Sequence, residues 1–205
     1  ARDVIVGRLG ATGVVVGWDF RFGRGRGGGV DALRTVVPGP VEQVGGVTWD
    51  AEIVSSTRIR SELLAGRVAS AADLLTRPHA LVGEVVPGDG RGRTVGIPTA
   101  NIAVSSGLVP KHGVYAVRAQ VDGVWRPGVA NLGDRPTFGP TEGRLEVHLI
   151  DDAPVPPLTG RTLRVSLIDR VRDEQRFDGV EALVAQILAD IETARARLAS
   201  DPWPR

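Results

Sequence analysis

Residues 88–101 contain the residue types that could bind a polyphosphate. The stretch reads GDGRGRTVGIPTAN, and glycine tolerates positive φ and lets the backbone approach a ligand closely. Successive N–H groups can therefore converge here on anionic oxygens. An ordinary turn without a ligand is the other interpretation, and the glycine spacing alone leaves both open. The glycines of this stretch are Gly88, Gly90, Gly92 and Gly96.

The corner that ends this stretch offers oxygen ligands for a metal ion. Thr99 carries a hydroxyl and Asn101 an amide oxygen, and Mg²⁺ prefers hard oxygen donors in a shell that it shares with phosphates and water. The P-loop pattern GxxxxGK[ST] is absent, and Lys111 is the only lysine. Charge contacts to a phosphate must therefore come from arginines such as Arg93, from backbone amides or from the metal.

Four further motifs follow the glycine-rich stretch in a fixed order. They are GVYAV at 113–117, GVANLGDRPTF at 128–138, LEVHLID at 145–151 and RDEQRFDGVEAL at 172–183. Several ordered motifs are far more specific than one glycine-rich run. In this order and at these distances, the motifs resemble the riboflavin kinase module of the bacterial bifunctional riboflavin kinase/FAD synthetases, over residues 77–200.

The preceding residues resemble another part of the same family. Residues 14–28, VVVGWDFRFGRGRGG, and 54–68, VSSTRIRSELLAGRV, are similar to the second half of its adenylyltransferase domain, but the HxGH nucleotide-binding motif has no counterpart. We therefore expect a truncated domain and no adenylyltransferase activity from this chain. The predicted domains are a partial α/β adenylyltransferase domain at 1–76 and a riboflavin kinase domain at 77–200.

The elements that must position these residues are mainly short strands. From residue 80 onward, apolar segments of strand length are punctuated by glycine and proline, without intervening helices, which predicts an antiparallel barrel. The resemblance implies six strands. Helical spacing of apolar residues predicts a C-terminal helix, with Asp178 and Glu181 as its capping box. The predicted strands are 81–86, 113–121, 124–130, 145–150 and 162–169.

In the N-terminal part, Val14 to Val16 predict a short buried strand that runs into a loop. A helix is expected to begin at Ser55–Thr57, and a second one covers 69–75. The N-terminus of the first helix could bind a phosphate, although an ordinary N-cap is the plainer interpretation. By resemblance, the remnant adenylyltransferase site comprises Asp19, Phe20, Phe22, Ser55, Ser56, Thr57 and Arg60.

The resemblance implies transfer of the ATP γ-phosphoryl group to the ribityl hydroxyl of riboflavin, which gives FMN. The four glycines, Arg93 and Thr99 would hold ATP, Thr99 and Asn101 would position Mg²⁺, and Glu146 would be the general base. On periodicity alone, the favoured interpretation of Glu146 is a solvated residue on the polar face of a strand. The family often has an aromatic residue where this chain has Ile97.

For the flavin ring, the resemblance points to Arg172, Glu174 and Phe177, which could supply hydrogen bonds and an apolar wall. The same segment could instead be a polar turn before a helix. A second group, on the loop at 128–138, would help close the site. It consists of Asn131, Arg135 and Thr137.

Composition restricts the remaining classes. The 205 residues have a net charge of +1, no cysteine and three scattered histidines, which gives no electrostatic reason to expect nucleic acid or membrane partners and excludes thiolate metal sites. No apolar run approaches 18 residues, so a cytoplasmic protein is expected. The resemblance implies small-molecule substrates. Two alternatives stay open: a flavin- or nucleotide-binding module without turnover, and RNA binding through the Arg/Gly run at 21–29.

Overall fold

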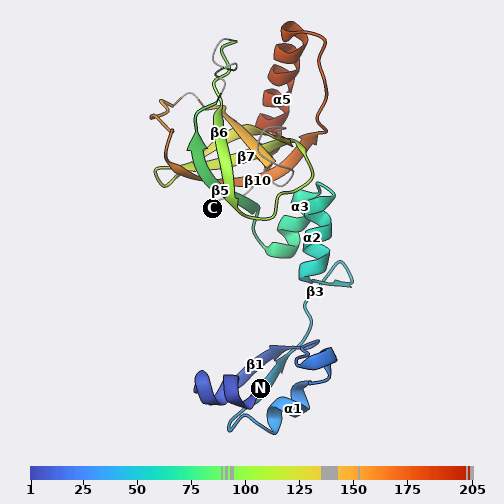
Figure 1. Ribbon diagram of the computed structural model, residues 1–205. Helices are drawn as coiled ribbons and strands as arrows, with labels where there is room; N and C mark the ends of the chain where they lie inside the picture. Colours follow the sequence, from blue (N-terminus) through green and yellow to red (C-terminus); the bar gives the residue numbers. More distant parts are fainter. Residues whose placement is uncertain are drawn as a thin grey trace. The chain divides into compact units, whose positions relative to one another are not determined.

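The computed structural model describes residues 1–88, 90, 92, 95–134, 143–151, 153–201 and 203 (Figure 1). The chain divides into two compact units, Ala1–Val54 and Ser55–Arg205. The predicted boundary between residues 76 and 77 lies inside the second unit, because helices α2 and α3 belong to the unit that contains the barrel. Each unit is described by itself.

The first unit contains a small parallel pair of strands. Strand β1 (Val14–Gly17) pairs in parallel with β2 (Val41–Val44), and helix α1 (Val30–Arg34) lies between them in the chain. A π-helical segment (Arg2–Arg8) precedes this pair, and a short 3₁₀ turn (Arg24–Arg26) lies between β1 and α1. A two-stranded hairpin, β3 (Thr48–Trp49) and β4 (Glu52–Ile53), ends the unit.

Strand β1 is less buried than predicted. Only Val16 is buried, whereas Val15 leaves 64% of its surface exposed. The prediction of a buried strand was wrong for Val15, because β1 has a single parallel neighbour among the described residues and one of its faces is uncovered.

The second unit begins with two helices, α2 (Ser56–Leu64) and α3 (Val68–Leu75). Ser55 caps α2, since its hydroxyl accepts a hydrogen bond from the backbone N–H of Arg58 at 3.2 Å. This satisfies one of the free donors of the first turn. Leu63 of α2, and Val68 and Ala71 of α3, are buried in the same core as the barrel side chains.

Six strands form the closed barrel predicted by the resemblance. Their order around it is β10-β5-β6-β9-β8-β7, and every neighbouring pair is antiparallel. Closure leaves no strand at an edge. The strands are β5 (His79–Val86), β6 (Ala100–Ser106), β7 (Gly113–Val121), β8 (Val124–Asp134), β9 (Gly143–Leu149) and β10 (Thr162–Arg172).

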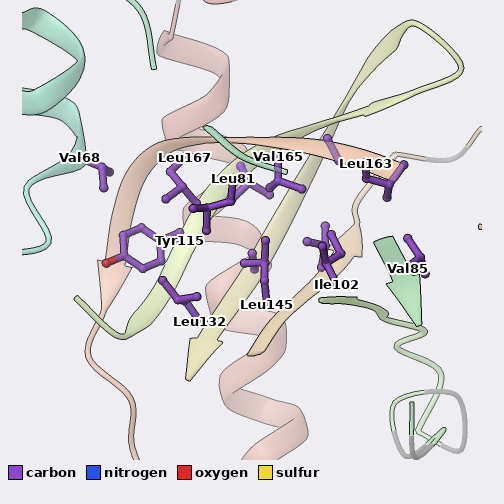
Figure 2. Close-up of a cluster of buried hydrophobic side chains, with 14 of the residues drawn as sticks. Val68, Leu81, Val85, Ile102, Tyr115, Leu132, Leu145, Leu163, Val165 and Leu167 are labelled. Carbon is purple, nitrogen blue, oxygen red and sulfur yellow. The ribbon is translucent and has the colours of Figure 1, made fainter. Parts of the chain in front are cut away.

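Inward-facing apolar side chains fill the barrel. Tyr115, Leu145 and Leu167 are completely buried, and Figure 2 shows them converging with residues from other strands. A second cluster lies where the C-terminal helix α5 (Val180–Ser200) packs on the barrel, with Ile191 and Ala194 among its buried members. The first cluster thus fills the barrel, and the second holds α5 against it.

The start of α5 differs from its predicted cap. Gly179 is the N-cap residue, and no side chain makes a capping hydrogen bond there. The prediction that Asp178 caps this helix with Glu181 was therefore wrong. Gly179 has an extended backbone, and glycine is an acceptable N-cap residue without any side chain.

Candidate functional site

A pocket of about 640 Å³ lies between the barrel wall and α5. Its lining comes from the glycine-rich stretch, from strands β6 to β10, from the segment after β10 and from α5. Most residues predicted for catalysis and flavin binding are brought together here. The predicted residues that line it are Gly90, Gly92, Thr99, Asn101, Asn131, Glu146, Arg172, Glu174 and Phe177.

Strand β9 places Glu146 at the centre of one wall. Glu146 lies in register with Asn101 on β6 and with Asn131 on β8, so an amide side chain flanks the carboxylate on each neighbouring strand. Leu145 and Val147 are buried on the inner face. Because side chains alternate along a strand, Glu146 projects outward from the barrel core and into the pocket.

Arg144 connects the carboxylate to the amide. Its Nε lies 2.5 Å from Glu146 Oε1 and donates to Asn101 Oδ1 at 2.8 Å, and its Nη2 also bonds to this oxygen. The Glu146 side chain remains 29% exposed. On the same strand, His148 Nδ1 lies 2.8 Å from the carbonyl oxygen of Pro98, which ties β9 to the corner that carries Thr99.

Two glycines before this corner, Gly88 and Gly92, pack tightly on it. A Cβ atom on Gly88 would lie 1.9 Å from Asn101 Nδ2, and one on Gly92 would lie 2.2 Å from the carbonyl oxygen of Ile97. Ile97 is buried. Any side chain at these two positions would displace the corner, so here glycine permits close approach. Arg93 lies outside the described residues.

Another part of the pocket lining is a group of apolar side chains. The group consists of Phe177 and, on α5, Val180, Leu183 and Ile187. The Arg172 guanidinium lies 5.8 Å from the centre of the Phe177 ring, a cation–π distance. Arg135 and Thr137, predicted to help close the site, lie outside the described residues.

Comparison with known proteins decides the family. A model of the riboflavin kinase family matches residues 75–198. The chain belongs to the riboflavin kinase family. It is 41% identical over 197 residues to the bifunctional riboflavin kinase/FMN adenylyltransferase of Pseudomonas fluorescens, and 41% identical over 204 residues to that of Escherichia coli K12. These alignments cover 94% of this chain but 63% and 62% of the relatives.

A solved structure described as a macrolide-efflux protein from Streptococcus pneumoniae is also similar. It is 36% identical, with a TM-score of 0.82, over 93% of this chain and 62% of that one. Within the described part of this riboflavin kinase family member, no helix has both the length and the apolar character needed to cross a membrane.

The predicted remnant adenylyltransferase residues fall in both units. In the first unit, Asp19 and Phe20 line a pocket of about 450 Å³ with Trp18 and several arginines. Phe22 stacks on Phe20 with ring centres 5.7 Å apart. The remaining four residues, Ser55, Ser56, Thr57 and Arg60, lie at and after the start of α2 in the second unit.

The oxygen donors of this pocket fit magnesium better than a softer metal. Thr99 is exposed, and Asn101 supplies an amide oxygen, although Arg144 already bonds to that oxygen. Among the described residues, no group of three or more His, Cys, Asp or Glu side chains could hold a metal alone. A site of this kind suits Mg²⁺, which takes few protein ligands and completes its shell with phosphates and water.

Sequence reasoning missed four functional candidates: Arg144, the apolar face of α5 at Val180 and Leu183, and Asp190. The helical spacing of α5 predicted an apolar face against the barrel, and this packing is observed. Periodicity cannot tell, however, which turn of that face lines a cavity. Asp190, a charged residue within the helix, is 3% exposed and also lines the pocket.

Proposed function

We propose that the barrel domain transfers the γ-phosphoryl group of ATP to the primary ribityl hydroxyl of riboflavin, giving FMN and ADP. The family membership of residues 75–198 supports this activity. The observation that carries the proposal is the register of Glu146 with Asn101 in a pocket that Thr99 also lines. A base and phosphate-side ligands within one pocket are what an in-line phosphoryl transfer needs.

In this proposal Glu146 accepts the proton of the ribityl hydroxyl as its oxygen attacks the γ-phosphorus. The bond between this phosphorus and the β–γ bridging oxygen breaks, and ADP leaves with its electron pair. Thr99 and Asn101 would hold Mg²⁺, which when bound neutralises charge on the phosphate oxygens. The glycine-rich stretch supplies backbone N–H groups to the phosphates.

We infer the orientation of the substrates from two parts of the pocket lining. The isoalloxazine ring is mainly apolar and fits the part lined by Phe177, Val180 and Leu183. The phosphates fit the other part, at Gly90 and Thr99. The ribityl chain would then extend along the wall where Glu146 lies, which brings its terminal hydroxyl to the base.

The relatives are described as bifunctional, and this chain spans about 62% of their length. We propose only the kinase activity for these 205 residues, because the HxGH motif of the family's adenylyltransferase does not occur in them. Charge on the α-phosphate and pyrophosphate would lack that support during adenylyl transfer.

The test is incubation of the purified chain with riboflavin, ATP and magnesium, followed by chromatographic separation of the flavins. FMN without FAD is the expected product. Clear FAD formation would contradict the expected loss of adenylyl transfer. Riboflavin binding without FMN would favour the non-catalytic binding module, and retention of RNA with no affinity for riboflavin would favour the Arg/Gly run at 21–29.

A further inference from the structure

Asp190 is a buried carboxylate inside the C-terminal helix. It lies on α5, is 3% exposed, and is one of only four buried polar residues in the described part of the chain. Removing a carboxylate from water is costly unless hydrogen bonds and an opposite charge compensate. The contacts of Asp190 therefore show which groups compensate for this desolvation cost and which residues the carboxylate holds in place.

Both oxygens of Asp190 are occupied by Arg172. The Nε of Arg172 donates to Oδ1 at 2.9 Å and to Oδ2 at 3.0 Å, and its Nη2 donates to Oδ2 at 2.7 Å. Gln186 Nε2 donates to Oδ1 at 2.9 Å. A planar guanidinium held in this forked manner has one orientation, which a single-point contact would not impose.

The Arg172 guanidinium also contacts residues in and next to the pocket wall. Arg172 is the last residue of β10, and its guanidinium lies 5.8 Å from the centre of the Phe177 ring. Its remaining nitrogen, Nη1, donates to the carbonyl oxygen of Asp173 at 2.8 Å. Arg172 thus links Asp190 both to the backbone of Asp173 and to the Phe177 ring in the segment that leaves β10.

Two neighbouring contacts hold the same segment. The Asp173 carboxylate lies 2.7 Å from Arg170 Nη2 and 2.9 Å from Lys111 Nζ. Glu174 packs so closely on β8 that a Cβ atom on Gly133 would lie 2.2 Å from its Oε1. Asp173 and Glu174 are therefore supported from the barrel side. Among the described contacts from α5, Asp190 is the residue that holds Arg172, and Gln186 in turn holds Asp190.

We infer that Asp190 is a positioning residue that sets the affinity for riboflavin by holding Arg172, and through it Phe177, in the shape of the flavin-binding part of the pocket. This inference rests on the proposed function. A wall that is already ordered lowers the entropic cost of binding. Within the described part of the chain, no hydrogen bond or ion pair joins Thr99 or Glu146 to Asp190 or Arg172, so we expect ATP binding and the chemical step not to depend on Asp190.

The decisive variant is Asp190→Asn. It keeps the size of the side chain, but it removes the charge and turns an N–H₂ group toward one of the Arg172 donors. We expect the KM for riboflavin to rise about 10- to 100-fold, the range for loss of a hydrogen bond to a charged group. The KM for ATP and kcat at saturating riboflavin are expected to stay within about twofold.

Asp151→Asn is the matched control. Asp151 forms a similar forked contact with the buried Arg126, at 2.8 Å from its Nε, and neither residue lines the pocket. Asp151→Asn therefore removes the partner of a buried arginine at a position outside the pocket lining. We expect lower thermal stability and an unchanged KM for riboflavin, which separates positioning from a general structural effect.

A double-mutant cycle tests whether Asp190 acts through Arg172. If it does, Asp190→Asn adds little to the riboflavin KM of Arg172→Gln, whereas additive effects would overturn the inference. An unchanged riboflavin KM in Asp190→Asn, or equal increases for both substrates, would overturn it too. If Asp190→Asn does not fold, the riboflavin Kd of Gln186→Leu decides: a rise supports the inference and no change refutes it.

Failure of the proposed function would be visible separately. A wild-type chain that forms no FMN contradicts the kinase proposal whatever the variants do. A wild-type chain that forms FMN, with Asp190→Asn indistinguishable from it, contradicts only the role of Asp190.

Discussion

Replacing Glu146 with glutamine is the sharpest test of the proposed chemistry. Glutamine has the same shape and can still accept a hydrogen bond through its oxygen, but it cannot take up the proton of the ribityl hydroxyl. General base catalysis contributes about 10²- to 10⁴-fold to a rate. At 1.36 kcal/mol per factor of ten, the barrier is expected to rise by about 2.7 to 5.4 kcal/mol, all of it in kcat.

The structure limits how much of this loss could come from damage to the fold. The substitution removes the ion pair between Glu146 and Arg144. The side chain of Glu146 is 29% exposed and that of Arg144 is 23% exposed. Pairs this accessible contribute about 0–1 kcal/mol to stability. Arg144 also keeps its hydrogen bonds to Asn101. The expected loss of stability is thus several times smaller than the expected rise of the barrier.

The assay is steady-state FMN formation at saturating ATP and magnesium, with a thermal melt of each variant. Glu84→Gln is the control, because Glu84 is an exposed carboxylate on β5 that does not line the pocket. We expect Glu84→Gln to behave as the wild type. A Glu146→Gln enzyme whose kcat stays within twofold of the wild type would eliminate Glu146 as the general base.

Two other predictions concern the phosphate side of the site and the core. Thr99→Ala is expected to raise the KM for Mg-ATP and to lower kcat, because the hydroxyl is proposed to bind metal and phosphate in both the ground and the transition state. Titration of magnesium at fixed ATP measures this effect, and an unchanged magnesium requirement would contradict the prediction. Leu145→Ala removes a completely buried side chain from β9 and is expected to lower the free energy of unfolding by about 3–5 kcal/mol. Urea denaturation measures the second effect, and a loss below about 1 kcal/mol would mean that the barrel core can collapse around the missing atoms.

The strands that were predicted from sequence share a clear local signal. The segment at 113–121 was predicted with the bounds that β7 has, since its apolar residues lie between a glycine and a turn. Strand β6 (Ala100–Ser106) was missed as a segment, and only the resemblance implied a sixth strand. It contains Asn101 and two terminal serines, so its hydrophobic pattern is weak, and pairing with β5 and β9 determines its conformation.

The part of the candidate site that lies on neighbouring strands could be predicted from the motifs of the sequence. Glu146 and Asn101 come from separate motifs, and the structure places them in register. Arg144 and Asp190 could not be found in this way, because their significance depends on which partner lies within hydrogen-bond distance. A charged residue in a helix is usually solvated, and nothing in the local sequence distinguishes Asp190 from the exposed Glu192.

Closure of the barrel also determines when this domain can fold. Strand β10 pairs with β5, and the register joins Thr162 to Glu84, so the last strand of the barrel must return to the first. Contacts between such distant parts of the chain are slow to form, because the loop entropy is lost before the contacts compensate for it. Until Arg172 has left the ribosome, β5 and β7 both present unpaired edges. We therefore expect the nascent domain to depend on chaperones, or to aggregate, during synthesis of its final third.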